Sequence, residues 1–172
     1  MIEALGRTSA LGIDPSVVME LPMTENTNSE IRHVYERWHE NVVTRNLDGL
    51  MELYDENATL ESPLVLAVLK EREAGILKGK QAIAPFFARG FQSPENGLGR
   101  WYRTGTFFSN GRQLTWEYPR DTPQGDQVDL VEVMDLANGL IAHHRVYWGW
   151  VGFQALVAAS TKPTPARVEA RQ

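Results

Sequence analysis

The chain has 172 residues, of which 42% are hydrophobic and 23% are charged, values typical of a single globular domain with one core. It contains no cysteine, which excludes disulfides, thiol nucleophiles and thiolate metal sites. The formal net charge of −5 is spread without blocks of like sign, so binding to nucleic acid has little electrostatic support.

Residues 1–26 include two prolines and predict an N-terminal arm. They lack the basic start and the apolar core of a secretion signal. The longest uninterrupted apolar run, residues 63–69, is too short to span a bilayer. We therefore expect a cytoplasmic protein without a membrane partner.

The first predicted helix begins at a capping box, in which Thr27 and Glu30 satisfy each other's backbone groups. Apolar residues then follow the i, i+3, i+4, i+7 spacing of one buried helix face. These residues are Ile31, Val34, Tyr35, Trp38 and Val42. Asn46 predicts the cap of a second, shorter helix, which we expect to run through Tyr54.

The next segments alternate between extended and helical patterns. Residues 58–62 predict a short strand that a proline stops. Residues 64–75 allow two interpretations, an extra helical turn or a lid over a cavity. A third helix is predicted over residues 81–91, and Pro85 suits a first turn, so we expect this helix to begin near Ala82.

After Gly99 the apolar period changes from 3.6 to 2, which is the period of a strand. Asn110-Gly111 and Asn138-Gly139 each separate two such runs, and this dipeptide is the strongest short-range signal for a hairpin. Helices followed by antiparallel hairpins predict an α+β domain over residues 27–160. Residues 161–172 read as a C-terminal tail.

The second hairpin, residues 128–150, carries the best candidate site. Because side chains alternate across a strand, Glu132 and His144 each lie among apolar residues of their own strand. If the two strands match in parity, a carboxylate and an imidazole lie opposite each other on one apolar face. We expect them to line one cavity and to be the catalytic residues. Their apolar neighbours, which we expect to contact substrate, are Leu130, Met134, Val146 and Trp148.

Glu132 is expected to polarise or protonate the substrate, and His144 to shuttle the proton, because a neutral imidazole exchanges protons near neutral pH. The pair would also fix the imidazole tautomer. The alternative is a structural role for each, satisfied by buried hydrogen bonds. His143 must point to the other face, toward the surface or a dimer partner. On that face a solvated or interface role is favoured for Asp129 and Asp135.

No metal or cofactor site is predicted. Neighbouring strand residues point apart, so His143 and His144 cannot chelate one ion. His33 and His39 fall on different faces of the first helix. The glycines between residues 97 and 111 do not form a phosphate-binding loop between a strand and a helix.

Three sequence motifs occur in order before the hairpins: Asn46-Leu-Asp-Gly-Leu-x-x-Leu-Tyr54, Asn57-Ala-Thr-Leu-Glu61 and Gly79-Lys-x-x-Ile83. With the two hairpins, the second ending in Val146-Tyr-Trp148, they resemble the nuclear transport factor 2-like superfamily over about residues 28–156. Within it the chain looks closest to SnoaL-like proteins and ketosteroid isomerases. The resemblance implies a cone-shaped, cystatin-like fold, in which a curved antiparallel sheet wraps about three helices around an apolar pocket. It also implies a homodimer formed through the sheet.

At the site the resemblance to ketosteroid isomerases is partial. Ser62 stands where those enzymes have their basic aspartate, and Trp38 stands where they have a tyrosine that donates to the oxyanion. Their second oxyanion donor, a protonated aspartate, falls on Glu132, and their pocket aromatic is retained as Trp148. An enolising isomerase needs both a base and an oxyanion hole, so steroid isomerisation by that route is not expected. Trp38, Ser62 and Tyr54 are further candidates for contact with a ligand.

These observations predict a SnoaL-like protein with an apolar pocket. The first hypothesis is a cofactor-free isomerase, cyclase, dehydratase or hydrolase that acts on a small hydrophobic ring compound by acid–base chemistry. An Asp-Arg-Asp arrangement for epoxide opening would involve Arg103, Arg145 or Asp129, but no parity argument brings these together. The alternatives are a non-catalytic module for a small ligand and a dimeric scaffold for protein interactions.

Overall fold

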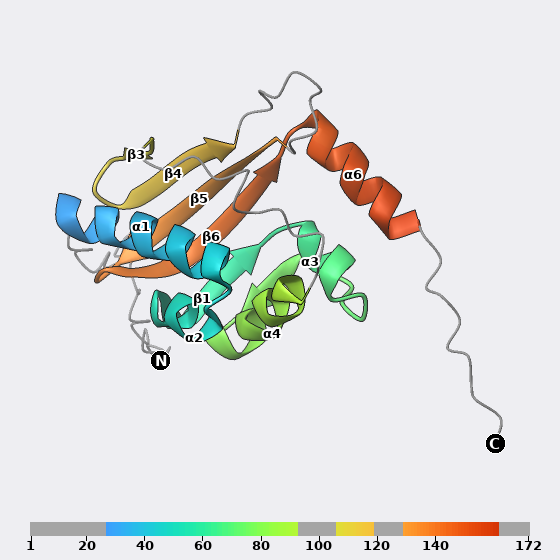
Figure 1. Ribbon diagram of the computed structural model, residues 1–172, viewed down its shortest axis with the longest axis horizontal. Helices are drawn as coiled ribbons and strands as arrows, with labels where there is room; N and C mark the ends of the chain where they lie inside the picture. Colours follow the sequence, from blue (N-terminus) through green and yellow to red (C-terminus); the bar gives the residue numbers. More distant parts are fainter. Residues whose placement is uncertain (1–26, 93–105, 119–128, 162–172) are drawn as a thin grey trace, which may run out of the picture.

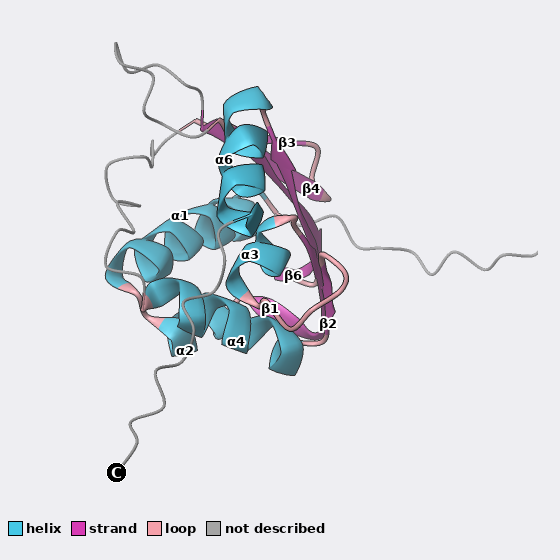
Figure 2. Ribbon diagram, turned by 90° about the vertical axis from the view of Figure 1, so that its right-hand side faces the viewer, coloured by secondary structure: helices cyan, strands magenta, loops and turns pink. Residues whose placement is uncertain are grey.

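The computed structural model describes residues 27–92, 106–118 and 129–161. In these residues a curved, unclosed six-stranded sheet carries helices against one of its faces (Figure 1, Figure 2). This arrangement confirms the α+β fold that the sequence predicts. The expected arm (residues 1–26) and nearly all of the expected tail (residues 162–172) lie outside the described residues.

Helix α1, Asn28–Thr44, begins at the predicted capping box. The Glu30 backbone N–H donates to the Thr27 hydroxyl, and the Thr27 backbone N–H donates to the Glu30 carboxylate at 2.6 Å. All five residues of the predicted apolar face are buried. The helix ends at Arg45, whose φ of 59° is left-handed.

Helix α2, Leu47–Glu52, is capped by Asn46 as predicted, but it ends before Tyr54. Tyr54 begins strand β1, Tyr54–Glu61, instead. The prediction that the second helix runs through Tyr54 is therefore wrong. The prediction that the strand starts at residue 58 is also wrong, because it starts at Tyr54. The reason is long-range pairing: Tyr54 lies beside Ile141, and the Leu53 carbonyl accepts the N–H of that residue, so the sheet overrides the local helical pattern.

The segment after β1 forms a short helix α3, Leu64–Val68, which buries Val65. This supports the interpretation as a helical turn rather than a lid. Strand β2, Ile76–Lys78, leads into helix α4, Lys80–Phe91. Pro85 lies inside that helix rather than in its first turn, because the Gly79 carbonyl already accepts the N–H groups of Ala82 and Ile83.

The remaining strands are β3 (Phe108–Ser109), β4 (Gln113–Tyr118), β5 (Leu130–Ala137) and β6 (Leu140–Trp148). The strand order is β2-β1-β6-β5-β4-β3. Neighbouring strands are antiparallel, except that β1 and β6 run parallel. Asn138 and Gly139 both have positive φ, at 53° and 76°, as a tight hairpin turn requires.

Strand β6 ends at Trp148, and helix α6, Trp150–Thr161, follows it. The predicted hairpin runs to residue 150, but Trp150 starts this helix and is 69% exposed. Asp129 fixes the change of direction, because its carboxylate accepts the N–H of Gly152 in the first turn of α6 at 2.9 Å. Asp129 is thus a helix cap rather than a solvated residue.

The core lies between the concave face of the sheet and helices α1, α2 and α4 (Figure 2). On this inner face the register sets Trp116 of β4, Glu132 of β5 and Val146 of β6 side by side. The helices in the described ranges are too short or too polar to cross a membrane.

We predict that Thr27→Ala lowers the free energy of unfolding by about 1 kcal/mol, because it removes the hydroxyl that caps α1. Thr27→Ser keeps a capping hydroxyl and is the matched control. Urea denaturation of the three proteins measures the difference. Equal stability of Thr27→Ala and Thr27→Ser would contradict the role of the cap.

Candidate functional site

Glu132 and His144 lie together on the inner face of the sheet, as the parity argument predicts. His144 Nε2 is 2.5 Å from Glu132 Oε2. Their residues are 1% and 6% exposed. The pair is diagonal rather than directly opposite, because the register places His144 beside Met134 and Glu132 beside Val146. Diagonal neighbours in a sheet remain within reach of long side chains.

Tyr54 and Trp38 extend this pair into a chain of buried hydrogen bonds. The Tyr54 hydroxyl oxygen is 2.8 Å from His144 Nδ1, and the Trp38 indole N–H donates to the same hydroxyl oxygen at 3.3 Å. Trp38 comes from α1, Tyr54 from β1, His144 from β6 and Glu132 from β5. The chain therefore joins four elements that are far apart in the sequence.

The donors in this chain of hydrogen bonds determine which nitrogen of the His144 ring carries the hydrogen. An indole nitrogen only donates, so the Tyr54 oxygen accepts from Trp38. Burial, and secondarily the charge of Glu132, raises the pKa of Tyr54, so the phenol keeps its hydrogen and donates it to His144 Nδ1. The single hydrogen of the neutral imidazole then lies on Nε2 and is donated to Glu132. Glu132 accepts this bond as a carboxylate.

The second oxygen of Glu132, Oε1, is the open end of the chain. Within the described ranges, the buried side-chain atoms without a hydrogen-bond partner are Asn41 Nδ2 and Trp116 Nε1. Glu132 keeps 8% of its side chain exposed, whereas His144 keeps 2%. Oε1 has no hydrogen-bond partner among the described residues. Because it is also absent from the set of fully buried atoms without a partner, it retains contact with solvent.

His39 forms a second buried polar link that the sequence analysis missed. Its Nδ1 is 2.7 Å from the Tyr35 carbonyl, and its Nε2 is 3.3 Å from the Tyr118 hydroxyl. Burial lowers the pKa of His39 despite the opposing effects of the Tyr35 carbonyl and Glu132, which favours the neutral imidazole. Its position eight residues after Ile31, on the apolar face of α1, was the available signal.

The residues expected to contact a ligand differ in their burial. Trp38, Tyr54 and Met134 are at most 2% exposed and belong to the packed core. Leu130, Val146 and Trp148 are half-buried on the same sheet face. Ser62 is buried, and its hydroxyl lies 3.4 Å from the Trp148 indole nitrogen. Contact of these residues with a ligand stays a prediction.

The opposite face of the sheet carries a second polar cluster, built from the other histidine of β6. His143 Nε2 is 2.7 Å from Glu61 Oε1, and its Nδ1 is 2.9 Å from an Arg145 nitrogen. Arg145 also forms an ion pair with Asp135 at 2.6 Å, and Gln113 donates to the same carboxylate at 2.9 Å. Asp135 is therefore ion-paired rather than solvated.

Partial burial acts to raise the pKa of Asp135, but the hydrogen bonds from Arg145 and Gln113 outweigh it and hold this pKa below its usual value. The Asp135 hydrogen bond in turn raises the pKa of Arg145. Asp135 and Arg145 are thus a charged ion pair at neutral pH.

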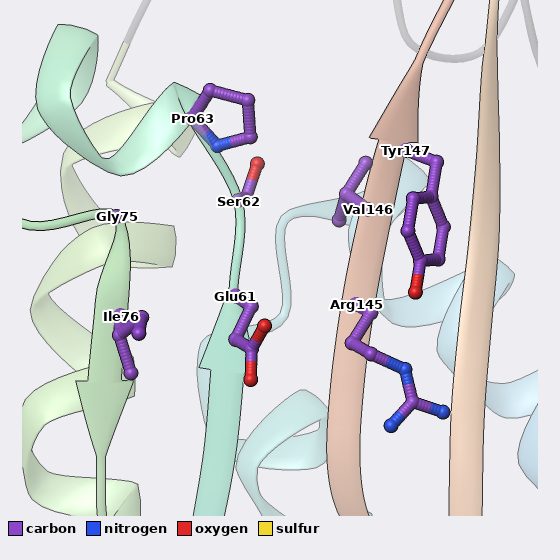
Figure 3. A pocket seen from close by; sticks show the side chains of 8 residues that line it. All are labelled: Glu61, Ser62, Pro63, Gly75, Ile76, Arg145, Val146 and Tyr147. Carbon is purple, nitrogen blue, oxygen red and sulfur yellow. The ribbon is translucent and has the colours of Figure 1, made fainter.

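A cleft of about 240 Å³ opens beside this outer cluster (Figure 3). It lies where the paired ends of β1 and β6 separate. The residues around it are Glu61, Ser62, Pro63, Gly75, Ile76, Arg145, Val146 and Tyr147. Two residues expected at an inner pocket, Ser62 and Val146, therefore border an outer cleft.

In the described ranges, no group of three or more His, Asp or Glu side chains is arranged to hold a metal ion.

Comparison with known proteins identifies a family and a fold. The SnoaL-like domain family matches residues 35–144. A comparison with curated proteins gives no match.

Three solved structures are similar in fold. A SnoaL-like protein from Burkholderia thailandensis has 13% sequence identity and a TM-score of 0.54, over 73% of this chain and 99% of its own. An NTF2-like protein from Mesorhizobium loti has 18% identity and a TM-score of 0.51, over 70% and 92%. A steroid delta-isomerase from Pseudomonas aeruginosa has 17% identity and a TM-score of 0.50, over 81% and 92%.

We predict that Tyr54→Phe lowers the free energy of unfolding by roughly 1–3 kcal/mol, because it leaves His144 Nδ1 buried without its hydrogen-bond donor. Tyr147→Phe is the matched control, since Tyr147 is 56% exposed and its loss of a hydroxyl should change stability by less than about 0.5 kcal/mol. Urea denaturation at pH 7 measures both. An equal effect of the two substitutions would contradict the buried chain.

Proposed function

The chain belongs to the SnoaL-like domain family, and from this we propose that it is an enzyme in which Glu132 exchanges a proton with a small hydrophobic ring compound. The reaction class is that of a cofactor-free isomerase, cyclase, dehydratase or hydrolase working by acid–base chemistry. The observation that carries the proposal is the free, solvent-contacting oxygen of a carboxylate whose other oxygen is held by a buried imidazole.

The hydrogen bonds support a division of labour between the two candidate catalytic residues. Both ring nitrogens of His144 are engaged, one with Tyr54 and one with Glu132. We therefore assign His144 as a positioning residue and Glu132 as the catalytic residue. This differs from the expectation that His144 itself shuttles the proton.

In the proposed step, Glu132 Oε1 takes a proton from the substrate, or from the attacking water in a hydrolysis, and returns it to another atom of the substrate. The Nε2–H of His144 holds Oε2, so the carboxylate presents Oε1 in one orientation. The same donor stabilises the carboxylate before it is protonated. The half-buried side chains of Leu130 and Trp148 would contact the ring of the substrate.

The alternatives are less well supported. A module that binds without chemistry would satisfy its polar groups internally, but Oε1 of Glu132 has no partner in the described ranges. One protein of similar fold is named a steroid delta-isomerase. Ser62 and Trp38 occupy the positions of the isomerase base and tyrosine, so we do not extend that reaction to this chain. Homodimerisation through the sheet and a cytoplasmic location stay predictions from the sequence.

The test is a screen of ring ketones, epoxides and lactones with the wild-type protein, followed by kinetics of variants. Glu132→Gln keeps the size of the side chain and an oxygen that accepts from His144, but it removes the base. We predict that kcat/KM falls by about 10²–10⁴-fold, the usual contribution of a general base.

Glu117→Gln removes a carboxylate from an exposed position on β4 and should leave kcat/KM unchanged. Turnover by Glu132→Gln at the wild-type rate would exclude Glu132 from the mechanism.

A further inference from the structure

The outer cleft contains a carboxylate oxygen that forms no ion pair with a Lys or Arg side chain of the described residues. Glu61 projects between Ile76 of β2 and Arg145 of β6, its register partners on either side (Figure 3). Glu61 Oε1 bonds to His143, and Oε2 has no partner in the described ranges. The Glu61 side chain is 42% exposed, so Oε2 is open to a ligand.

The charges of this cluster can be assigned from its hydrogen bonds. Arg145 only donates, so His143 Nδ1 accepts from it and the hydrogen of the neutral imidazole lies on Nε2, directed at Glu61. Arg145 contacts both oxygens of Asp135, at 2.8 Å and 2.6 Å. The guanidinium is therefore ion-paired with Asp135 and interacts with Glu61 only at longer range, so the three charged groups keep one net negative charge.

No other cation in the described ranges neutralises Glu61. Lys78 lies on the same outer face beside Thr59, two residues along β1 from Glu61, and it forms no ion pair in this part of the chain. Lys80 pairs with Glu56 at 2.8 Å instead. Within the described residues, the cleft thus presents a carboxylate that has no direct ion pair with a Lys or Arg side chain.

The walls of the cleft are partly apolar. Ile76 is 46% exposed, which is high for an isoleucine, and Tyr147 is 56% exposed. Pro63 and Val146 complete the apolar lining. A carboxylate flanked by exposed apolar surface is complementary to a small organic cation with a short carbon chain.

We propose that the outer cleft binds a small primary alkylammonium ion, whose ammonium group donates to Glu61 Oε2 and whose carbon chain covers Ile76 and Pro63. This site lies on the opposite face of the sheet from Glu132 and is independent of the proposed proton transfer. It involves binding only, with no bond made or broken.

The test is a titration of the full chain with n-butylammonium chloride at constant ionic strength, followed by the methyl NMR signals of Ile76. We predict a saturable shift of these signals. Butan-1-ol has a similar chain without the charge, and we expect it to bind at least about fivefold more weakly, as loss of a charge-assisted contact at a half-exposed site implies.

Variants separate a local site from general electrostatics. Glu61→Gln keeps an oxygen for His143 but removes the charge, and it should weaken butylammonium binding by roughly fivefold to tenfold. Glu117→Gln removes the same charge from β4, elsewhere on the outer face, and should leave binding unchanged. Unsaturable shifts, equal affinity for the alcohol, or equal loss in both variants would overturn the proposal. Inactive Glu132→Gln protein should still bind butylammonium, so the two proposals fail separately.

Discussion

The structure of the site depends on a buried hydrogen-bond chain that must be complete within the protein. The residues Trp38, Tyr54, His144 and Glu132 are at most 6% exposed, and a buried polar group without a partner costs about 1–3 kcal/mol. The Trp38 indole can only donate, so the Tyr54 oxygen accepts from it and the Tyr54 hydrogen is donated to His144. The direction of the remaining bond, from His144 to Glu132, follows from this. Its end, at Glu132 Oε1, is the point where the chain meets solvent.

Strand β6 uses its alternation to build two carboxylate–histidine pairs back to back. His144 bonds to Glu132 on the inner face, and His143 bonds to Glu61 on the outer face. In both pairs a donor on Nδ1 directs the Nε2 hydrogen at the carboxylate. The donor is a phenol on the inner face and a guanidinium on the outer face. The inner pair is buried and the outer pair is partly exposed. The inner pair is therefore suited to proton transfer, and the outer pair to electrostatic binding.

Local sequence signals predicted the parts of the fold that depend on local chemistry. The capping box of α1 and the Asn138-Gly139 turn are of this kind, and alternation was sufficient to place Glu132 and His144 on one face. The errors concern long-range partners. Tyr54 has a helical pattern locally but pairs with Ile141. The direction change after Trp148 depends on Asp129, which lies 23 residues before its hydrogen-bond partner Gly152.

The same distinction explains what was missed at the site. Tyr54 contacts His144 because β1 and β6 pair in parallel. A hairpin turn predicts only the pairing of consecutive antiparallel strands, so it gives no signal for this pairing. The outer cluster also depends on Glu61 of β1 lying beside β6, so the sequence did not predict it. Parity gives the face of a side chain, whereas its hydrogen-bond partner depends on which strands are neighbours.

The most direct measurement of the central claim is the tautomer of His144 at pH 7, from the ¹⁵N chemical shifts of the ring nitrogens and their couplings to the ring protons. The hydrogen-bond order predicts a neutral ring with its hydrogen on Nε2 and a bare Nδ1. A hydrogen on Nδ1, whether in the other neutral tautomer or in the imidazolium, would contradict the donation from Tyr54 and the assignment of Glu132 as the open end of the chain.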